Sequence, residues 1–310
     1  MYQHSFRFLM NIMSTARVSR VSRVFCLSAY LCLAGFFSVT PSFAFAQQIT
    51  KEEAVQKSDD NIAYELTNPL SNLQLVSLQW NHNRGLGANQ AGTSQTYQMS
   101  PKIKVDINQD WNFFSRVYIN ASKVQNVNGV NNSGMGPTQI EGFFSPKTDG
   151  KIVYGIGPYI QMPGGQSGEF GSTQWGAGIR GVFVAMPKPW TFAVYAHQSW
   201  SVGGSTGAGT PASPGTGTVN TLSVWPTVSY TTDNAWVYSL DSEAVYNYDV
   251  RRAYVPVNTL ISKVVRIDGA PVSFGVGARY NVSSYPGTIQ YPGTPRGWGA
   301  RAQINFILGN

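Results

Sequence analysis

Apolar and polar residues alternate with a period of two through most of the chain, most clearly near its C-terminus. Residues 271–281 and 297–308 carry aliphatic or aromatic side chains at every second position, with Ser, Gly, Arg, Gln or Asn between them. A period of two is typical of a β-strand with one apolar and one polar face. A soluble sandwich can show this pattern, but a transmembrane barrel requires it, because lipid lies outside and water inside. We interpret residues 271–308 as the closing hairpin of such a barrel.

The same pattern repeats from residue 71 onward and predicts an all-β fold, a closed antiparallel transmembrane β-barrel of about twelve strands. Each predicted strand is close to the ~9–11 residues that cross a bilayer at a tilt. An even number of strands places both ends of the barrel on the same, periplasmic side. The predicted strands are residues 72–81, 95–107, 111–121, 138–145, 151–163, 174–186, 190–202, 219–231, 236–248, 253–265, 271–281 and 297–308.

The connections between these strands alternate in length, which favours a membrane barrel over a soluble sandwich. Every second connection is short, as expected for periplasmic turns: 108–110, 146–150, 187–189, 232–234 and 266–270. The others are rich in Gly, Ser, Asn and Pro and mostly long, as expected for extracellular loops: 82–94, 122–137, 164–173, 203–218 and 282–296, with 249–252 as a short exception.

Aromatic residues gather at both ends of the predicted strands, as in the two interfacial girdles of a membrane barrel. Trp111, Trp190 and Trp236 follow short turns, and a second set adjoins the other ends: Trp80, Trp200, Tyr246, Tyr280 and Trp298. Four prolines fall inside predicted strands, where each removes a ladder donor: Pro101, Pro158, Pro226 and Pro256. In a barrel without edges we expect them at bulges or unpaired positions.

Residues 1–46 have the character of a secretory signal peptide, with four arginines, an apolar segment and the cleavage pattern Ala44-Phe45-Ala46. Removing these arginines lowers the formal net charge from +7 to +3, so the basic isoelectric point gives no argument for nucleic-acid binding. Both cysteines, Cys26 and Cys32, lie in the predicted signal peptide. The mature chain therefore needs a source of stability other than disulfides, which a closed hydrogen-bonded barrel supplies.

Residues 47–70 are charged and of helical composition, and Asn68-Pro69 ends the segment. We predict a periplasmic N-terminal segment that forms a helix or small plug at the barrel mouth, with a flexible exported arm as an equal alternative. The barrel itself is predicted to span residues 71–310.

Charged residues fall on the faces assigned to the lumen, and we take them as candidate pore-lining residues: Arg116, Glu141, Arg180, His197, Asp241, Glu243, Arg279 and Arg301. Lys102, Lys104 and Asp106 fall nearer the periplasmic end. Such charges can form a constriction that orients polar or aromatic-acid solutes, or a paired network that fills a narrow lumen. If Arg116 pairs with Glu141, then Arg279 and Arg301 leave a net positive potential near the outer mouth and favour anions.

No catalytic, cofactor or metal site is predicted. His197 and Ser199 share the inward face, so neither can attack a lipid headgroup from the outer wall, and His82 falls in a predicted loop. The sequence has no His/Cys cluster with metal-ligand spacing. The Gly-rich stretches WGAGIRG and YGIGPY continue a strand alternation and precede no helix, so they are not phosphate loops.

Several stretches resemble a family of bacterial outer-membrane transporter-like proteins that carry the labels "neuromedin U" and "MetA-pathway of phenol degradation". The stretches are LTNPLSNLQLVSLQW, GFFSPK, YGIGPY, WGAGIRG, HQSWSV, VGARY and GWGARAQINF, in the same order from about Leu66 to Phe306. The resemblance implies a closed barrel that passes small, often hydrophobic or aromatic, molecules. This chain departs from the family pattern at Pro137, where an acidic residue is expected, and at Thr173 and Gln174, in place of a Glu-Lys pair.

The sequence therefore predicts a monomeric outer-membrane channel or transporter for passive passage of small solutes. Its partners are the lipid bilayer, the solutes and the outer-membrane assembly machinery. A structural or surface-interaction barrel with a blocked lumen is the alternative, and a membrane-embedded hydrolase a weaker one. At the C-terminus, either Phe306 is the terminal aromatic read by the assembly machinery and residues 307–310 overhang, or Leu308 ends the lipid-facing row.

Overall fold

The structure, a computed structural model, describes residues 58–148, 150–164, 173–204, 219–249, 251–284 and 293–309. The predicted signal peptide, residues 1–46, lies outside these ranges, as do residues 47–57 and the centres of three predicted long loops. Among the described residues, no helix is long and apolar enough to cross a membrane.

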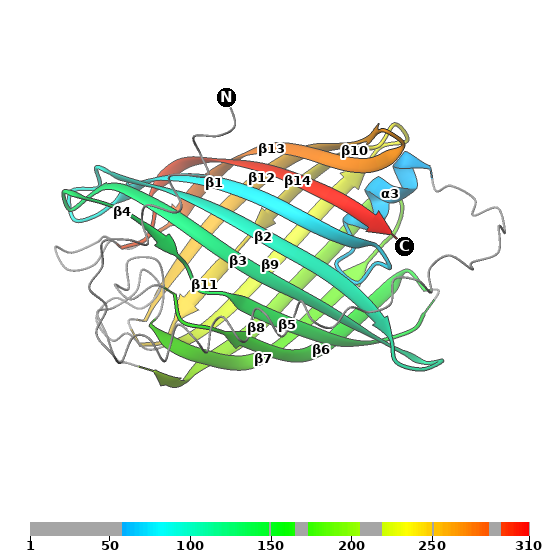
Figure 1. The fold of residues 1–310 in the computed structure, drawn as a ribbon, viewed down its shortest axis with the longest axis horizontal. Helices are drawn as coiled ribbons and strands as arrows, with labels where there is room; N and C mark the ends of the chain where they lie inside the picture. The colour runs from blue at the N-terminus through cyan, green and yellow to red at the C-terminus, as the bar shows by residue number, and fades with distance from the viewer. Residues whose placement is uncertain are drawn as a thin grey trace, which may run out of the picture. The chain divides into compact units, whose positions relative to one another are not determined.

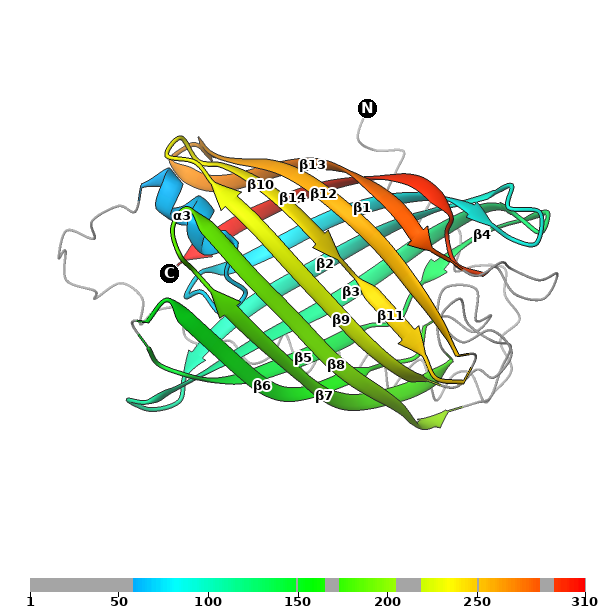
Figure 2. The same cartoon turned by 180° about the vertical axis from the view of Figure 1, so that it is seen from behind.

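Antiparallel strands close into the predicted twelve-stranded barrel (Figure 1 and Figure 2). β1 pairs with β2 and β14, and β12 pairs with β13, which completes the circle. Two positions in the barrel are each shared by two short strands, β4 with β5 beside β3, and β10 with β11 between β9 and β12. The strands are β1 (Gln74–Leu86), β2 (Gly92–Asp106), β3 (Trp111–Val127), β4 (Val130–Met135), β5 (Gln139–Pro146), β6 (Ile152–Gln161), β7 (Gln174–Ala185), β8 (Trp190–Gly204), β9 (Asn220–Thr231), β10 (Trp236–Ser242), β11 (Ala244–Asn247), β12 (Arg252–Ile267), β13 (Ala270–Ser283) and β14 (Gly297–Gly309).

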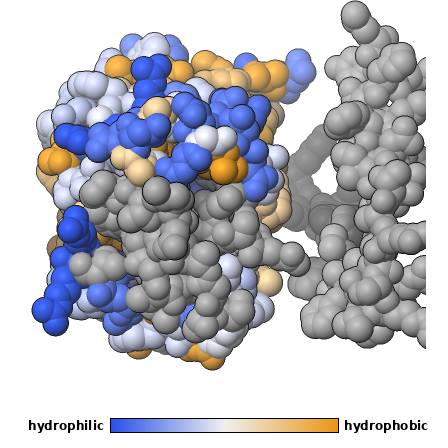
Figure 3. Space-filling view, turned by 90° about the vertical axis from the view of Figure 1, so that its left-hand side faces the viewer, coloured by the Kyte–Doolittle hydropathy of each residue, from blue (hydrophilic) through white to orange (hydrophobic). Residues whose placement is uncertain are grey.

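The barrel has two different ends, which we call the turn end and the loop end. Short turns join the strands at the turn end, where the helix α3 (Asp59–Leu66) also lies (Figure 2). The predicted long loops leave from the loop end. Figure 3 looks onto the loop end, whose rim is largely hydrophilic, with hydrophobic side chains at the edge of the view.

Side chains alternate between the outer wall and the lumen as the sequence predicts. In β13, Phe274 and Val276 are exposed, whereas Arg279 is buried. In β14, Phe306 is exposed and Arg301 is buried. Large apolar side chains therefore cover the outer wall and charged ones fill the interior, which is the reverse of a soluble domain and is required of a barrel in lipid.

The last strand continues past Phe306. β14 runs to Gly309, which pairs with Gln74, and Leu308 remains on the outer wall with 69% of its surface exposed. Residues 307–309 are therefore part of the strand rather than an overhang. Of the two accounts given by the sequence, the strand geometry supports an outward row that ends at Leu308.

Replacing Ile304 with arginine should block assembly of the barrel. Ile304 lies on the outer wall between its Cα partners Leu78 of β1 and Phe274 of β13. An arginine there would face hydrocarbon at a cost of about 2–4 kcal/mol near the bilayer midplane. The heat-modifiable band on SDS gels of the membrane fraction should disappear, as it should for Phe306→Asp.

The matched control for this substitution is Gln303→Ala, one residue away in the lumen. The Gln303 amide donates hydrogen bonds to Ser77 Oγ at 3.1 Å and Asn305 Oδ1 at 3.0 Å, so its loss should weaken two polar contacts and leave assembly intact. Normal levels of heat-modifiable Ile304→Arg protein would contradict the assignment of faces in the closing strand.

The four strand prolines lie where pairing is interrupted, as predicted: Pro101, Pro158, Pro226 and Pro256. Pro158 pairs with Ile179 of β7, but the ladder between β5 and β6 is broken beside it. Pro256 lies at a bulge against β13 and opposite the break between β10 and β11. Because the N–H and C=O of a strand residue point to the same neighbour, each missing donor affects one neighbouring strand only.

The structure corrects two predicted loops, 82–94 and 122–137. β1 and β2 extend through most of the first, and β3 and β4 through most of the second, so that the hairpins project from the loop end (Figure 1). His82 accordingly belongs to β1 rather than to a loop.

Polar pairs on the lumen side join β2 and β3 next to the base of the projecting hairpins. Gln98 donates to Asn120 Oδ1 at 2.9 Å, and the hydroxyls of Thr96 and Ser122 lie 3.2 Å apart. A small apolar cluster adds packing between the hairpins: Leu86, Val124 and Val127. Because this part of the strands has few outward apolar residues, the alternation that marks a membrane strand is absent.

Candidate functional site in the barrel lumen

The eight candidate residues lie at inward-facing positions and gather into two clusters on different walls of the lumen. Several are deeply buried, with Arg180 at 0%, Glu141 at 2%, and Arg279 and Arg301 each at 6% exposed. A side chain with 0% exposure has no surface that a water molecule can touch. Neighbouring side chains therefore fill the part of the lumen around the Arg180 guanidinium.

The first cluster, the aromatic–arginine cluster, surrounds the Glu141–Arg180 pair. Arg180 Nη1 lies 2.6 Å from Glu141 Oε2, a close charge contact without the angles of a hydrogen bond. The Tyr118 hydroxyl donates to the other carboxylate oxygen, Glu141 Oε1, at 2.8 Å. The cluster comprises Arg116, Tyr118, Glu141, Tyr159, Arg180, Tyr195, His197 and Trp225.

Aromatic rings enclose the Arg180 guanidinium. Its Cζ lies 4.2 Å from the ring centroid of Trp225, 4.7 Å from that of Tyr195 and 5.8 Å from that of Tyr159. The His197 ring in turn lies 4.4 Å from Tyr159 and meets Trp225 edge to face at 5.6 Å. Each cation–π contact stabilises a desolvated guanidinium by roughly 1–2 kcal/mol, which offsets part of the cost of burying its charge.

The predicted pairing of Arg116 with Glu141 is replaced by a different pair. Arg116 is the Cα partner of Glu141 across β3 and β5, but the ion pair that forms is between Glu141 and Arg180. Arg180 reaches Glu141 across β6, where its register partner Gly157 has no side chain, and a Cβ there would collide with the Gly142 carbonyl of β5. Arg116 instead lies over the Tyr118 ring, with 5.9 Å from its Cζ to the ring centroid.

The second cluster, the carboxylate-bridged cluster, is centred on Glu243. Its two carboxylate oxygens accept from Arg279 Nη2 at 2.7 Å and from Arg301 Nη2 at 2.8 Å. Arg301 also donates from Nε to Asn81 Oδ1 at 2.8 Å and lies 3.7 Å from Asp241 Oδ1. The cluster comprises Asn81, Asp241, Glu243, Asn258, Arg279 and Arg301.

This geometry corrects the expected positive potential at Arg279 and Arg301. The two arginines are not register partners, since Gly277 rather than Arg279 stands opposite Arg301. Both are neutralised by Glu243, and Asp241 adds a second carboxylate. The cluster has two positive and two negative charges, so its arginines do not form a free anion-attracting surface.

A segment of the chain before β1, residues 58–73, occupies the turn end, and we call it the mouth segment. It contains α3, whose Ile62 and Ala63 are buried against Val237 and Val264 of the barrel wall. Farther along the segment, Leu70 packs in a second apolar cluster with Phe114 of β3. The mouth segment therefore runs across the turn end of the lumen rather than hanging free of it.

Polar contacts fix the mouth segment to several strands. The Tyr64 hydroxyl donates to the Met186 carbonyl at 2.7 Å, and Lys188 Nζ donates to Asn61 Oδ1 at 2.9 Å. Burial raises the pKa of Tyr64, so its hydroxyl stays protonated as a donor. Arg266 Nε pairs with Asp59 Oδ1 at 2.8 Å on the opposite side.

Lys102 anchors the end of the mouth segment from inside the barrel. The sequence placed this lysine near the periplasmic end, and the structure adds its contacts. Its Nζ donates to the Ser71 carbonyl at 3.1 Å and the Ser71 hydroxyl at 3.0 Å, and the residue is 3% exposed. Lys104 and Asp106 form an ion pair at 3.1 Å at the turn end, away from the lumen clusters, with Asp106 exposed and Lys104 half-buried.

Replacing Glu141 with glutamine should destabilise the barrel by about 3–5 kcal/mol, because Arg180 would keep its buried charge without a counter-ion. Tyr118 could still donate to the amide oxygen of the glutamine, so the loss of stability reports the missing negative charge and not a missing hydrogen bond. Denaturant unfolding in detergent, followed by tryptophan fluorescence, measures the loss. Asp106→Asn, at an exposed pair, should leave the midpoint nearly unchanged. Equal midpoints for Glu141→Gln and the parent would show that the buried pair is dispensable.

The site gives no support to a hydrolase that acts on lipid. His197 and Ser199 are buried inside the barrel at 6% and 1% exposure, facing away from the outer wall. The His197 ring is packed between two aromatic rings. In the described part of the chain, no group of three or more His, Cys, Asp or Glu side chains is placed to hold a metal ion.

Sequence reasoning missed the aromatic half of the first cluster: Tyr118, Tyr159, Tyr195 and Trp225. It assigned aromatic residues to the outer wall, although the alternation of faces along each strand indicates that these four point inward. Tyr118 is two positions from Arg116, and Tyr195 is two positions from His197, so each shares the inward face of its strand. The partners across the lumen come from distant strands and leave no signal in local sequence.

The comparisons with known proteins support the fold. No protein-family model and no curated protein matches the sequence. The chain is similar to the crystal structure of the COG4313 outer membrane channel from Pseudomonas putida F1, with 9% identity and a TM-score of 0.59, over 76% of this chain and 96% of that chain.

Two further solved structures match with lower scores. The β domain of the Bordetella autotransporter BrkA has 12% identity and a TM-score of 0.40, over 76% of this chain and 100% of that chain. OprB from Pseudomonas putida at low pH has 10% identity and a TM-score of 0.29, over 76% of this chain and 91% of that chain. At such identities the likeness concerns the fold alone, and the family labels suggested by the sequence stay a prediction. The chain thus has the fold of an outer-membrane β-barrel.

Proposed function

We propose that the protein is a monomeric outer-membrane channel or transporter for passive passage of small solutes. In this proposal residues 1–46 direct export and are cleaved, the assembly machinery inserts the barrel, and the turn end faces the periplasm. Residues 71–310 form the barrel, and the segment 47–70 contributes a plug at its periplasmic mouth. The fold shared with an outer-membrane channel supports the proposal.

The observation that carries the proposal is the inverted distribution of side chains. Large apolar residues such as Phe274 and Val276 are exposed on the outer wall, while Arg180, Glu141 and Arg301 are buried inside. A soluble domain would not place charges in its interior and leave its apolar side chains in water. Lipid outside and a polar lumen inside account for both.

The solutes we expect are small and hydrophobic or aromatic, as the family resemblance implies. The rings of Tyr195 and Trp225 support this class, since planar molecules stack on such rings. The pore-lining role of the two clusters is part of the proposal, and the long loops would gate entry from outside. Passage requires the aromatic–arginine cluster and the mouth segment to move, because both fill space in the lumen.

A barrel with a permanently blocked lumen is the second candidate. The full burial of Arg180 and the packing of α3 against Val237 and Val264 favour it. Such a barrel would serve a structural or surface-interaction role.

Planar-bilayer recording separates the two candidates. A channel should give ohmic current steps after insertion of purified protein, and a sealed barrel should give none. Membrane placement is tested independently by heat-modifiable migration in SDS and by the need for detergent to extract the protein. Mature protein found soluble in the periplasm would refute the proposed location together with the function.

A further inference from the structure

Among the described residues, the basic side chains exposed at the loop end outnumber the acidic ones. In the described part of the chain, Asp249 is the acidic residue at this end, whereas seven lie at the turn end: Asp59, Asp60, Glu65, Asp106, Asp110, Asp233 and Asp268. The exposed basic residues at the loop end are Arg84, Lys123, Arg251, Arg252 and Arg296. None of the ion pairs found among the described residues involves any of these five.

These basic side chains begin directly beyond the aromatic girdle. Along β1, Trp80, His82 and Arg84 follow one another on the outer wall, with the first two rings 6.1 Å apart. On the opposite wall, Tyr246 and Tyr248 form an edge-to-face pair at 5.0 Å just before Arg251 and Arg252. Amphipathic rings mark headgroup level in a membrane, so the basic side chains stand at the height of lipid headgroups.

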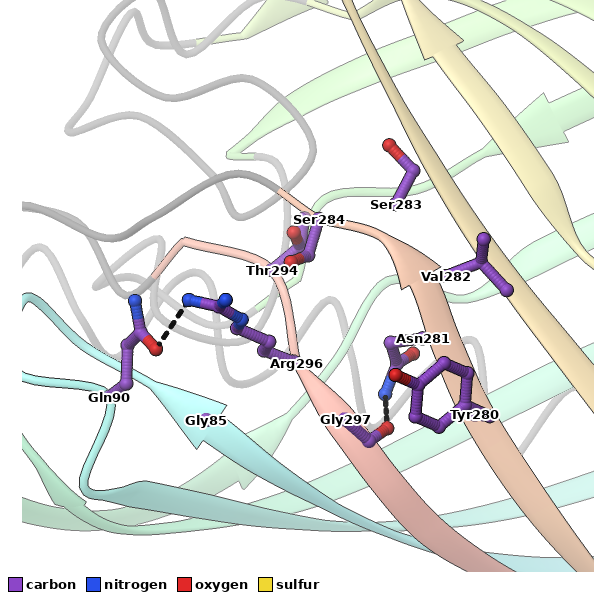
Figure 4. A pocket seen from close by; sticks show the side chains of 10 residues that line it. All are labelled: Gly85, Gln90, Tyr280, Asn281, Val282, Ser283, Ser284, Thr294, Arg296 and Gly297. Atoms are coloured by element: carbon purple, nitrogen blue, oxygen red, sulfur yellow. Dashed lines mark hydrogen bonds between the residues drawn. The ribbon is translucent and has the colours of Figure 1, made fainter.

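A polar hollow with a volume of about 480 Å³ lies at this height between the ends of β1, β13 and β14 (Figure 4). Arg296 enters it and donates from Nη1 to Gln90 Oε1 at 2.9 Å. A guanidinium carries five N–H donors, so one such bond leaves most of its capacity for a ligand. Hydroxyl and amide side chains complete the lining, among them Asn281, Ser284 and Thr294. None of the described residues that line the hollow is acidic.

A backbone hydrogen bond and a glycine at Gly85 hold Arg296 close to the end of β1. The Arg296 N–H donates to the Arg84 carbonyl at 2.8 Å. Gly85 adopts φ of +75°, and a Cβ there would lie 2.7 Å from Arg296 Cβ. A glycine is therefore needed at this point for Arg84 and Arg296 to stand side by side.

We propose that the loop end binds the phosphorylated sugar headgroup of a lipid in the surrounding leaflet, with Arg84 and Arg296 as phosphate ligands. Guanidinium groups suit phosphate, and hydroxyl and amide side chains suit sugar hydroxyls. The site lies beside the aromatic girdle, at the level where the headgroups of membrane lipids are held. This position favours a lipid over a soluble anion as the ligand. The proposal rests on the membrane placement given above and is independent of conduction.

Native mass spectrometry of the purified protein with a diphosphorylated diglucosamine lipid tests this. Each basic residue near an anionic surface contributes on the order of 1 kcal/mol, so Arg84→Gln/Arg296→Gln should weaken binding about thirtyfold. The dephosphorylated lipid should bind the parent protein as weakly as the phosphorylated lipid binds Arg84→Gln/Arg296→Gln. Arg84→Lys/Arg296→Lys, which keeps both charges, should retain most of the affinity.

Lys147→Gln/Lys151→Gln is the matched control, because it removes two basic charges at the turn end and should leave lipid binding unchanged. Heat-modifiable migration of every variant shows that the barrel is folded, and single-channel recording reports conduction separately. Unchanged affinity of Arg84→Gln/Arg296→Gln overturns the proposal, as does equal binding of the dephosphorylated lipid. Displacement of the lipid by equimolar inorganic phosphate would reveal a soluble-anion site and also overturn it.

Discussion

Deletion of residues 58–70 should increase the ohmic conductance of the barrel in planar bilayers. The deleted residues include α3, which packs against Val237 and Val264, and Leu70, which packs against Phe114. These contacts lie on separate walls, so the segment crosses the lumen at the turn end. Removing it takes away the mouth obstruction while the strand ladder stays complete.

Two substitutions refine this test without shortening the chain. Tyr64→Phe/Thr67→Val removes the bond from Tyr64 to the Met186 carbonyl and the contact between the Thr67 and Thr191 hydroxyls at 2.7 Å. We expect brief openings of the same amplitude as in the deletion variant. Asp59→Asn removes only a part-exposed ion pair with Arg266, worth no more than about 1 kcal/mol, and serves as the control. Identical conductance in the deletion variant and the parent would place the main barrier elsewhere, most directly at the aromatic–arginine cluster.

Replacing Glu243 with glutamine should shift ion selectivity toward anions. Glu243 is bound by Arg279 and Arg301 together, so its neutralisation leaves two guanidinium groups and the single carboxylate of Asp241. The resulting excess positive charge should attract anions and repel cations. Reversal potentials across a salt gradient measure the change, in a background with residues 58–70 deleted so that the mouth segment does not limit the current.

The same substitution should reduce stability, but by less than the roughly 3–5 kcal/mol of a fully buried pair, because 29% of the Glu243 side chain is exposed. Asp110→Asn removes a negative charge from an exposed turn and should change neither selectivity nor stability. An unaltered reversal potential in a correctly folded Glu243→Gln barrel would show that the carboxylate-bridged cluster does not face the ion pathway. Reversing Arg279 and Arg301 to Glu is a poorer test, since it would place four carboxylates in one cluster.

The sequence by itself determined the membrane barrel, the number of its strands and the face that each strand turns inward. This was possible because a bilayer imposes the same alternation on every crossing strand, and a period of two is read locally. Even the four strand prolines could be placed at pairing interruptions, since a missing N–H affects a ladder wherever it occurs. The projecting hairpins were missed because they extend past the hydrocarbon layer, where the outer face no longer has to be apolar.

Only the tertiary structure decided which inward residues meet. Arg116 and Glu141 are register partners, yet Glu141 pairs with Arg180 from β7, two strands away across β6. Glu243 binds two arginines from β13 and β14, which no sequence spacing relates to it. Likewise only the structure shows where residues 58–73 pack at the turn end, against Val237, Val264 and Phe114. Side chains meet across a lumen according to barrel closure and residue volume, which are set by all strands together and by no single stretch of sequence.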